Sequence, residues 1–544
     1  MHGLVLGATS SPAEEATLAA LLRCCVREVA GPRGLVWPAP PYLLLRVGGT
    51  LLRARTRGGA ALRLDGTPER LERGAWRPLT SEELVRLTEA ELHGTRPDGA
   101  ANEEFAGQVA ASREAVAAIL RARAGTEPPA DPWLASEQAL VFGHPFHPSP
   151  KARAGDADEW TRYAPETHAR FPLRLLAVRE DVLAEEGDAA ALDSLGEAPA
   201  GHRLLPAHPW QLDLLRDRLR PTLGGPLTDL GPGPWVSPTS SVRTVYVPEL
   251  AELAELGDAG VCLKFSLDVR ITNCVRKNAW YELAGAVELT SRLGPVFDEV
   301  GAVFPGTRWL REPGYRSAAL GTGLLEGLGV IVRESPWRVC SPGVVPVLAA
   351  ALAVDPAVGG PAPYGTDAFE RDPLGWWTAY VSAVAPPVLD LFFTHGVVLE
   401  PHLQNVLVGL DPDGVPREAV FRDLEGTKLV AGRHDLGGLP PRVAEALTYD
   451  AERGWARVVY CLLVNHLTEV AATVAARGGD ELLRELWRTA RAVFAAESDR
   501  LGRPLPLSDL LAGAPLPAKA NLGVRWARAA DRAAGYVPIA NPLA

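Results

Sequence analysis

The spacing of apolar residues in the first quarter of the chain predicts helices interleaved with short strands. Apolar positions recur at helical spacing in Glu14–Ala30 and Ser81–Leu92, whereas Tyr42–Val47 is a short apolar run typical of a strand. The segment 126–132 (TEPPADP) is rich in proline and acidic residues, as linkers often are. We therefore expect a first subdomain over residues 1–135, without a catalytic cluster.

A mixed pattern follows in residues 136–360. Strands are predicted at Leu173–Val178, Arg243–Val247 and Val261–Ile271. The last of these alternates almost strictly between apolar and polar residues, which indicates one strand with one buried face. Three prolines within 355–365 mark a second boundary.

Helical spacing dominates the remaining residues, 361–544. It is clearest in Trp376–His395, Tyr460–Arg477 and Glu481–Ser498. A chain of 544 residues exceeds what one hydrophobic core usually supports. Together these patterns predict a mixed α+β protein whose subdomains surround a shared cleft.

The composition narrows the classes of function. The chain is 47% hydrophobic and 22% charged and has no long apolar run free of charge or proline, which opposes a membrane span. Residues 1–22 lack a basic segment followed by an apolar one, so we expect no signal peptide and a cytoplasmic protein. The net charge of −11 opposes nucleic-acid binding. Six cysteines without a Cys-x-x-Cys pair oppose a disulfide framework and a structural zinc site.

Lysine is rare in this chain, which makes its positions informative. Arginine fills most of the basic positions of this chain, so a position that keeps lysine can mark a site that needs a compact ammonium group. Chance retention of lysine is the alternative. The five lysines, among 55 basic residues, are Lys151, Lys264, Lys277, Lys428 and Lys519.

A proline-rich loop, Gly143–Arg153 (GHPFHPSPKAR), carries two histidines and two cations. Three prolines stiffen the loop, so His144, Lys151 and Arg153 can present fixed groups to an oligophosphate. Zinc binding is an alternative, but no third ligand lies near His144 and His147 in the sequence. An ordinary structural loop is the other alternative.

Two further segments combine cations with hydroxyl groups. Ser240–Thr244 (SSVRT) surrounds Arg243 with hydroxyls at the start of a predicted strand, which suits a phosphate or simply ends a turn. The segment Leu263–Tyr281 begins as a strand with four polar residues on one face and ends in more cations. This arrangement indicates a phosphate or carboxylate site, or else a solvated edge. The four polar residues are Lys264, Ser266, Asp268 and Arg270.

The segment from Glu400 to Asp423 predicts a metal site. Two strand-like runs, 405–409 and 419–422, are joined by the turn Asp-Pro-Asp-Gly, which predicts a hairpin with Asn405 at its entrance and Asp423 at its exit. Such an Asn and Asp hold Mg²⁺ between phosphates in kinase-type phosphotransferases. The hard oxygens of Glu400, Asn405 and Asp423 suit Mg²⁺. An acidic surface hairpin is the alternative.

Several common nucleotide and hydrolase motifs are missing from the sequence. No Gly-Lys dipeptide is present, which excludes a Walker A loop, and no G-x-S-x-G elbow supports a serine hydrolase. The glycines of 321–329 do not have dinucleotide-binding spacing. Phosphate chemistry in this chain must therefore use another type of site.

In their order along the chain, the motifs resemble the IucA/IucC family, the siderophore synthetases that are independent of nonribosomal peptide synthetases. The resemblance spans about residues 140–526, and the one departure noted is Pro401, where a small residue is usual. The motifs are GHPFHPSPKAR (143–153), HPWQ (208–211), SSVRT (240–244), KFSLDVRITNCVRKN (264–278), EPHLQN (400–405), RDLEG (422–426) and KANLGVRW (519–526).

The resemblance implies a fold, an assembly and a division of the chain. It implies a cupped-hand α+β fold with a thumb (1–135), fingers that carry ATP and carboxylate motifs (136–360), and a largely helical, kinase-like palm with the Mg²⁺-binding hairpin (361–544). A homodimer is implied as well. ATP is expected between the fingers and the palm.

The resemblance also implies roles for individual residues. Lys264, Arg276 and His402 are expected to be catalytic, and His402 is also a candidate to take a proton from the nucleophile. The ATP-binding residues are expected to be His144, Lys151, Arg153, Ser241, Arg243, Thr244 and Lys264. The carboxylate-binding residues are expected to be Thr272, Arg276, His402 and Lys519, and the Mg²⁺ ligands Glu400, Asn405 and Asp423.

The implied activity is an AMP-forming ligation. A polycarboxylic acid, by expectation citrate, is adenylated by ATP, and an amine or alcohol then captures the acyl group, releasing AMP after pyrophosphate. The Asn-hairpin-Asp arrangement alone is equally compatible with a small-molecule kinase, which would release ADP. A non-catalytic ATP-binding subunit is the third alternative.

Overall fold

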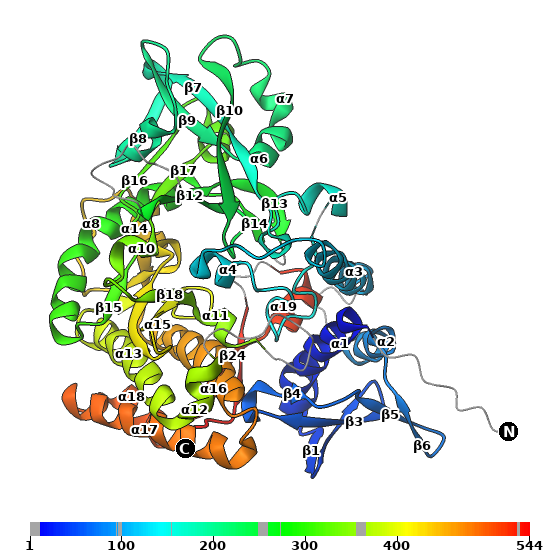
Figure 1. Ribbon diagram of the computed structural model, residues 1–544. Coiled ribbons are helices and arrows are strands. Elements are labelled where there is room, and N and C mark those ends of the chain that lie inside the picture. The colour runs from blue at the N-terminus through cyan, green and yellow to red at the C-terminus, as the bar shows by residue number, and fades with distance from the viewer. Residues whose placement is uncertain are drawn as a thin grey trace.

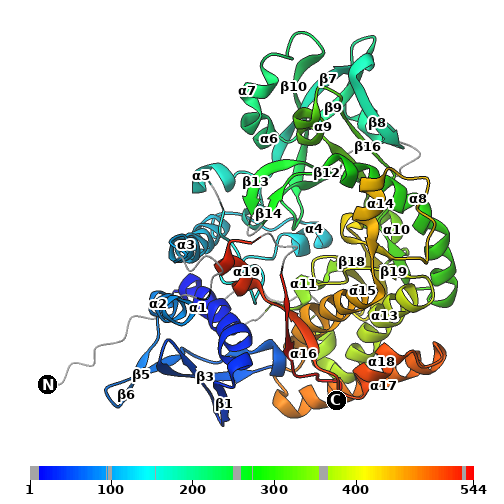
Figure 2. The same ribbon diagram turned by 180° about the vertical axis from the view of Figure 1, so that it is seen from behind.

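The three largest hydrophobic cores among the described residues each surround their own sheet or helical layer (Figure 1). The computed structural model describes residues 11–93, 95, 101–153, 155–248, 259–271, 274–354, 366–529 and 534–544. Seen from the opposite side, the N-terminal sheet and the C-terminal helices lie at the same end of the molecule, and the central eight-stranded sheet lies at the other (Figure 2).

The N-terminal unit packs α1 and α2 against a six-stranded sheet in the order β1-β2-β3-β5-β6, with β4 paired to β3. The predicted helix at Ser81–Leu92 begins there because Thr80 and Glu83 form a reciprocal capping box. The predicted strand Tyr42–Val47 is β2. The elements are α1 (Pro12–Cys24), η1 (Cys25–Ala30), η2 (Gly31–Arg33), β1 (Val36–Ala39), β2 (Tyr42–Val47), β3 (Thr50–Arg57), η3 (Gly59–Ala61), β4 (Arg63–Leu64), β5 (Glu69–Glu72), β6 (Ala75–Pro78), α2 (Ser81–Leu92) and α3 (Phe105–Arg123).

The central unit is an antiparallel sheet of eight strands in the order β8-β16-β17-β12-β11-β10-β7-β9. Two of its strands, β7 and β11, were expected from the sequence, and their apolar faces belong to one core. The elements are α4 (Pro132–Glu137), α5 (Ala157–Trp160), η4 (Pro165–Thr167), β7 (Phe171–Arg179), η5 (Glu180–Val182), β8 (Leu183–Gly187), η6 (Ala190–Leu195), β9 (His202–Ala207), α6 (Pro209–Leu214), α7 (Arg216–Leu219), β10 (Leu227–Pro238), β11 (Thr244–Val247), β12 (Val261–Phe265), β13 (Leu267–Ile271), β14 (Cys274–Arg276), β16 (Gly314–Ala318), α9 (Thr322–Gly327) and β17 (Val330–Glu334).

The prediction of one continuous strand over Val261–Ile271 is wrong. The chain breaks at Ser266, and the two halves join different sheets: β12 pairs with β11 and β17, whereas β13 pairs with β14. Ser266 donates its backbone N–H to the carbonyl of Gly329 and its hydroxyl to the carbonyl of Glu326, so both groups bind the end of α9 and the residues just after it, about sixty positions away. Lys264 and Asp268 therefore do not share one face of one strand.

The C-terminal unit is mainly helical and holds the largest core. Its four-stranded sheet, β15-β21-β20-β18, contains the predicted hairpin as β20 and β21. The elements are α8 (Trp280–Val303), β15 (Thr307–Trp309), α10 (Pro336–Val339), β18 (Val345–Leu348), α11 (Ala349–Leu352), α12 (Thr366–Arg371), α13 (Pro373–Phe393), β19 (Val397–Val398), β20 (Val406–Leu410), β21 (Pro416–Phe421), η9 (Leu424–Gly426), β22 (Lys428–Val430), α14 (Pro441–Leu447), β23 (Thr448–Tyr449), α15 (Ala451–Val459), η10 (Tyr460–Leu467), α16 (Thr468–Val474), α17 (Gly479–Arg500) and α18 (Leu505–Leu511).

The end of the chain returns to the N-terminal unit. It forms β24 (Leu516–Lys519), α19 (Asn521–Ala527) and β25 (Tyr536–Ile539). Leu522 and Trp526 of α19 belong to the N-terminal hydrophobic core. This return carries Lys519 from the C-terminal unit to the centre of the molecule.

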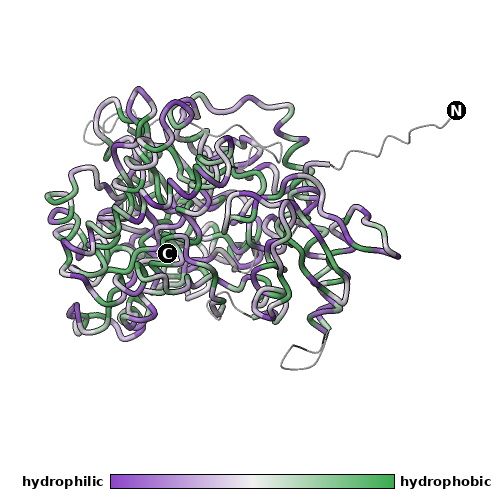
Figure 3. Tube along the Cα trace, turned by 90° about the horizontal axis from the view of Figure 1, so that it is seen from below, coloured by the Kyte–Doolittle hydropathy of each residue, from purple (hydrophilic) through white to green (hydrophobic). Residues whose placement is uncertain are grey.

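Hydrophobic and hydrophilic residues are interspersed along the chain (Figure 3). Within the described ranges, no helix combines the length and the apolar character that crossing a membrane requires.

Candidate functional site

A cavity of about 610 Å³ lies where the three units meet, and segments from all of them line it. Thr272 lies outside the described residues, and of Arg276 only the backbone is described. Twelve of the residues predicted for the site line this cavity: His144, Lys151, Arg153, Ser241, Arg243, Thr244, Lys264, Glu400, His402, Asn405, Asp423 and Lys519.

A buried network of opposite charges forms one wall of the cavity. Lys264, on β12 and 2% exposed, donates to Asp423 at 2.6 Å and lies 2.9 Å from the Glu425 carboxylate. Arg243 donates to Glu425 at 2.7 Å and to Asn278. Burial alone would lower the pKa of Lys264, but these carboxylates raise it, so its ammonium stays charged.

The carboxylates of this wall are held in their ionised form. Burial would raise the pKa of Glu425, but Lys264 and Arg243 lower it to about 2. The same cations, together with Arg333, hold the pKa of Asp423 well below its usual range. Asp423 and Glu425 are therefore fully charged near pH 7. A third carboxylate, the buried Glu312, pairs with Arg333 and lies 3.9 Å from Lys264, so the three cations of this network meet three carboxylates.

Asp423 has a backbone conformation that most residues avoid. It follows the end of β21 with φ 72° and ψ 69°, in the left-handed region. Aspartate tolerates this region better than most residues, and such strained positions cluster at functional sites. In this conformation the carboxylate accepts a hydrogen bond from Lys264 on β12, a strand of the central sheet.

The three predicted metal ligands all line the cavity but differ in their partners. Glu400 forms a salt bridge of 2.6 Å with Arg457, whereas Asp423 pairs with Lys264 of β12. Glu425, which was not among the predicted ligands, also pairs with Lys264. Gly426 packs against the Glu400 side chain, since a Cβ at that position would lie 2.9 Å from the Glu400 carboxylate. In the part of the chain that the structure describes, no three His, Cys, Asp or Glu side chains form a metal-binding group by themselves.

The oxygen donors of this wall nevertheless match the chemistry of Mg²⁺. Carboxylate and amide oxygens are its preferred protein ligands, and it is usually bound through one or two carboxylates together with substrate phosphates. Asp423 and Asn405 line the same part of the cavity, with Glu425 two residues beyond Asp423. This donor set fits a Mg²⁺ ion that arrives with an oligophosphate.

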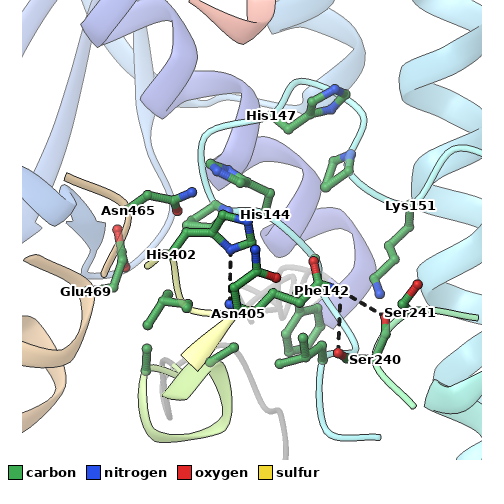
Figure 4. A pocket seen from close by; sticks show the side chains of 18 of the residues that line it. Phe142, His144, His147, Lys151, Ser240, Ser241, His402, Asn405, Asn465 and Glu469 are labelled. Carbon is green, nitrogen blue, oxygen red and sulfur yellow. Dashed lines mark hydrogen bonds between the residues drawn. The ribbon is translucent and has the colours of Figure 1, made fainter. Parts of the chain in front are cut away.

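His402 lies near the middle of the cavity (Figure 4). Its Nδ1 accepts a hydrogen bond of 3.3 Å from the backbone N–H of Gln404, and burial lowers its pKa to about 4. A neutral imidazole whose Nδ1 accepts carries its proton on Nε2. Near pH 7 the ring therefore offers a hydrogen-bond donor, which favours orienting an acid over taking a proton from an amine.

The proline-rich loop brings its cations to a shared carboxylate that the sequence analysis missed. Lys151 donates to Glu166, and Arg153 donates to the same oxygen at 2.6 Å. Burial would raise the pKa of Glu166, but Arg153 and Lys151 lower it to about 2. With two cations on one carboxylate, this corner of the cavity keeps a net positive charge.

A second missed residue is Glu137, which is fully buried beside the cavity. It accepts hydrogen bonds from Trp133 and from the backbone N–H of Ser240, and it pairs with Arg422. Arg422 also donates to the carbonyl of Gln404 at 2.7 Å. This network ties the SSVRT loop to the hairpin that is predicted to bind Mg²⁺. Its sequence signals were Arg422 in RDLEG and Ser240 in SSVRT, whereas nothing in the sequence marked Glu137.

The HPWQ motif has a structural role. His208 accepts from the backbone N–H of Trp210 and caps α6. Gln211 donates to the carbonyl of Gly327 and accepts from the backbone N–H of Asp268. Neither side chain is among those that line the cavity.

Comparisons with known proteins agree with this site. A family model described as "IucA / IucC family" matches residues 132–354, and one described as "Ferric iron reductase FhuF-like transporter" matches residues 375–534. The chain is 32% identical over 461 residues to the rhizobactin siderophore biosynthesis protein RhbC of Rhizobium meliloti, with 75% of each chain covered. The chain belongs to the IucA/IucC family.

Other relatives extend this result. The L-2,3-diaminopropanoate–citrate ligase of Staphylococcus aureus is 32% identical over 390 residues, which cover 66% of this IucA/IucC chain and 65% of the ligase. The ATP-bound structure of aerobactin synthetase IucA from Klebsiella pneumoniae superposes with a TM-score of 0.81 at 24% identity, covering 98% of this chain and 100% of that one. The petrobactin biosynthesis protein AsbB of Bacillus anthracis superposes with a TM-score of 0.76 at 17% identity, covering 97% and 95%.

These structural likenesses confirm the predicted α+β fold of IucA/IucC synthetases. The division into thumb, fingers and palm over 1–135, 136–360 and 361–544 stays a prediction. The roles of the individual site residues stay predictions as well.

Proposed function

We propose that this chain is an ATP-dependent ligase of siderophore biosynthesis that adenylates citrate and joins it to an amine or alcohol, releasing AMP and pyrophosphate. Family membership supports this proposal, as do relatives named as citrate ligases that use diaminopropanoate or spermidine, and an aerobactin synthase. The observation that carries it is that one cavity is lined by the cations Arg243 and Lys264, by the neutral histidine donor His402 and by Lys519.

The cation cluster is the proposed phosphate site. Arg243 and Lys264 bring charge that burial strengthens, and the hydroxyls of Ser241 and Thr244 lie on the same loop and strand. His144, Lys151 and Arg153 line the cavity from the proline-rich loop and complete the set. Lys264 and Arg243 now pair with the carboxylates of Asp423 and Glu425. If phosphate oxygens of ATP took the place of these carboxylates, both cations would still face negative charge.

We assign Mg²⁺ to Asn405 and Asp423, with Glu400 as the third ligand expected from the sequence. Glu425 is the alternative third ligand, because the carboxylates of Glu425 and Asp423 both pair with Lys264. When bound, Mg²⁺ supplies charge neutralisation to the phosphates. The protein's part is to hold these oxygens ionised, which Lys264 and Arg243 do.

We assign the acid to the part of the cavity beside His402 and Lys519, with Thr272 and Arg276 as further ligands. His402 Nε2–H can donate to a carboxylate, and the Lys519 ammonium adds charge. One carboxylate oxygen of citrate then attacks the α-phosphorus of ATP, the bond to the β-phosphate breaks, and pyrophosphate leaves with the electron pair. Lys264 and Arg243 stabilise the charge that develops.

The test is pyrophosphate release from MgATP by the purified protein, with hydroxylamine as the trap and citrate, 2-oxoglutarate and succinate compared. We expect release with citrate and a loss of at least about a hundredfold in Arg243→Ala and Asp423→Ala. The surface variant Arg477→Ala, whose side chain is 81% exposed, is the matched control and keeps wild-type activity. ADP as the product would favour a kinase, and binding of MgATP without turnover would favour a non-catalytic subunit.

A cytoplasmic homodimer is part of the same proposal. Light scattering coupled to size exclusion would test it, since a single mass of about 58 kDa would contradict the dimer.

A further inference from the structure

The loop that carries His402 contacts a buried part of the C-terminal helices. Pro401 comes directly before His402, and its carbonyl belongs to the peptide bond between the two residues. Because the proline ring fixes φ, the free backbone torsion at position 401 is ψ, which sets the direction of that carbonyl. A group that holds the carbonyl therefore also holds the backbone from which the His402 side chain projects.

His466 is the side chain that binds this carbonyl. It lies in η10, is fully buried, and its Nδ1 is 2.8 Å from the carbonyl oxygen of Pro401. A carbonyl can only accept a hydrogen bond, so Nδ1 carries a proton. Burial lowers the pKa of His466 to about 4, so the ring is neutral near pH 7 and its Nε2 is an acceptor. This is the opposite tautomer from that of His402.

Tyr380 of α13 supplies the donor that this tautomer needs. Its hydroxyl lies 2.5 Å from His466 Nε2, and its side chain is fully buried. The phenol ring stacks on those of Trp376 and Trp377, with ring centroids 5.1 and 5.9 Å away, which fixes its position. The Tyr380 hydroxyl donates to His466, and His466 donates to Pro401. One chain of hydrogen bonds thus runs from the core of the C-terminal unit to the loop.

A second contact holds the residue that follows His402. The backbone N–H of Leu403 donates to the carbonyl of Asn465 at 3.3 Å. In Figure 4, Asn465 and Ser241 lie on opposite sides of His402. Asn465 and His466 are consecutive residues of a π-helical segment, and π-helical turns are frequent at functional sites. This segment therefore fixes the backbone on both sides of His402.

We propose that Tyr380 and His466 are positioning residues that orient the Nε2–H of His402 toward the carboxylic acid. Neither of them belongs to the described residues that line the cavity, so they act through the loop and do not touch a ligand. Such support matters because a displacement of about 1 Å in a site can cost about a hundredfold in rate. The inference rests on the proposed function, in which His402 binds the acid.

The experiment measures citrate-dependent pyrophosphate release from MgATP, with hydroxylamine as the trap, in His466→Leu and His466→Asn. Leucine removes the donor, whereas the Asn amide can place an N–H near the position of Nδ1. In His466→Leu we expect the KM for citrate to rise about tenfold and the KM for MgATP to stay within about twofold of the wild type. His466→Asn should recover part of the loss. An unchanged KM for citrate in His466→Leu, or an equal rise in both KM values, overturns the inference.

A double-mutant cycle tests whether His466 acts through His402. In the His402→Leu background the ring to be positioned is absent, so His466→Leu should raise the KM for citrate by less than about twofold more. A rise as large as that in the wild-type background overturns the proposal. If His466→Leu does not fold, Tyr380→Phe replaces it in the same cycle, because it removes only one buried hydroxyl. We expect it to raise the KM for citrate about threefold in the wild-type background, and the same outcomes decide.

The matched control is His208→Leu. His208 is also a fully buried histidine whose ring binds a backbone group, at the start of α6. This variant should lower the melting temperature and keep the KM for citrate within about twofold of the wild type. A rise like that in His466→Leu would overturn the inference, since a loosened fold would then explain both. A wild-type protein without citrate-dependent release overturns both proposals, whereas release that is insensitive to His466 and Tyr380 overturns only this one.

Discussion

Four histidines hold their imidazole rings in the same way. In each of them, Nδ1 accepts a hydrogen bond from the backbone N–H two residues later, which places the proton of a neutral ring on Nε2. Burial lowers the pKa of His144 to about 3 and that of His402 to about 4. These two rings are therefore fixed, neutral donors over the physiological range. The four are His144, His147, His208 and His402.

The donor role of His402 leads to a first prediction. His402→Leu removes the Nε2–H, and a hydrogen bond to a charged carboxylate contributes about 1.5 to 3 kcal/mol. We expect the KM for citrate to rise roughly tenfold to a hundredfold, as measured by pyrophosphate release. His402→Gln, whose amide N–H₂ can occupy the Nε2 position, should recover part of this loss. If glutamine is as poor as leucine and kcat falls with unchanged KM, the donor role is wrong.

A second prediction concerns stability and pH. Burial lowers the pKa of His208 in the folded chain to about 3, against about 6.5 when unfolded. Below pH 6.5 the unfolded chain therefore binds a proton that the folded chain does not. Stability is lost as the pH falls from 6.5 toward 3, by about 2 kcal/mol between pH 7 and pH 5 for this residue.

The matched variant for this prediction is His208→Asn. The Asn oxygen can still accept from the N–H at the start of α6, so the cap is retained while the titration is removed. Urea unfolding at pH 7 and pH 5 should show a smaller loss of stability in the variant than in the wild type. An equal loss in both proteins would show that His208 is protonated in the folded chain near pH 5.

At the scale of elements, the hairpin of β20 and β21 ends in a turn that positions Asp423. Its left-handed backbone is available to asparagine but costly for a β-branched residue. A third prediction follows. Asp423→Asn should keep the melting temperature within a few degrees of the wild type and lower pyrophosphate release by at least about a hundredfold, because only the charge is lost.

Asp423→Val separates the two effects. It should lower the melting temperature further than Asp423→Asn, because valine must adopt the same backbone conformation. Circular dichroism measures both. Equal melting temperatures for the two variants would show that the left-handed turn is not under strain.

The strands and helices show which features a sequence can predict. Local signals gave the α2 helix, from its apolar spacing, and the hairpin, from its Asp-Pro-Asp-Gly turn, since these depend on neighbouring residues. The break at Ser266 was missed because its hydrogen bonds go to Glu326 and Gly329. Alternation of apolar and polar residues identifies an extended chain but not the sheet that it joins.

The candidate site shows the same difference between local sequence signals, which can be predicted, and long-range contacts, which cannot. The motif residues indicated where the cations lie, because a lysine among so many arginines stands out in the sequence. Their partners were not visible: Glu166 lies apart from Lys151 along the chain, and Glu425 binds Arg243 across 182 positions. Glu469 carries no motif at all. From the sequence alone, a carboxylate on a helix is expected to lie on the solvated surface. The structure instead places Glu469 beside the buried Arg63.

At the scale of the whole molecule, the cavity is the place where the units are joined. Arg23 comes from the N-terminal unit, Lys264 from the central sheet, Asp423 from the C-terminal unit and Lys519 from the returning segment. Arg63 adds a direct tie, since it donates to the backbone of Glu469 at 2.8 Å. A ligand that fills the cavity contacts several units at once and should stabilise them together.

The fourth prediction uses this coupling. A ligand that binds only the folded chain stabilises it by RT ln(1 + [L]/Kd), about 2.7 kcal/mol at a hundredfold excess over Kd. We expect MgATP to raise the melting temperature by a few degrees and citrate with MgATP to raise it further, because the two would fill adjacent parts of one cavity. Differential scanning fluorimetry measures both shifts.

Variants locate the effect within the cavity. Arg243→Ala should abolish the shift with MgATP because it removes a buried cation from the proposed phosphate site, whereas Arg477→Ala, on the surface, should keep it. Glu469→Gln should keep the shift with MgATP and citrate, since its carboxylate lies at the opposite end of the cavity from the phosphate loop. A shift with MgATP that survives Arg243→Ala would place the nucleotide elsewhere, and the cation cluster would then be a structural network that holds β12 to the hairpin.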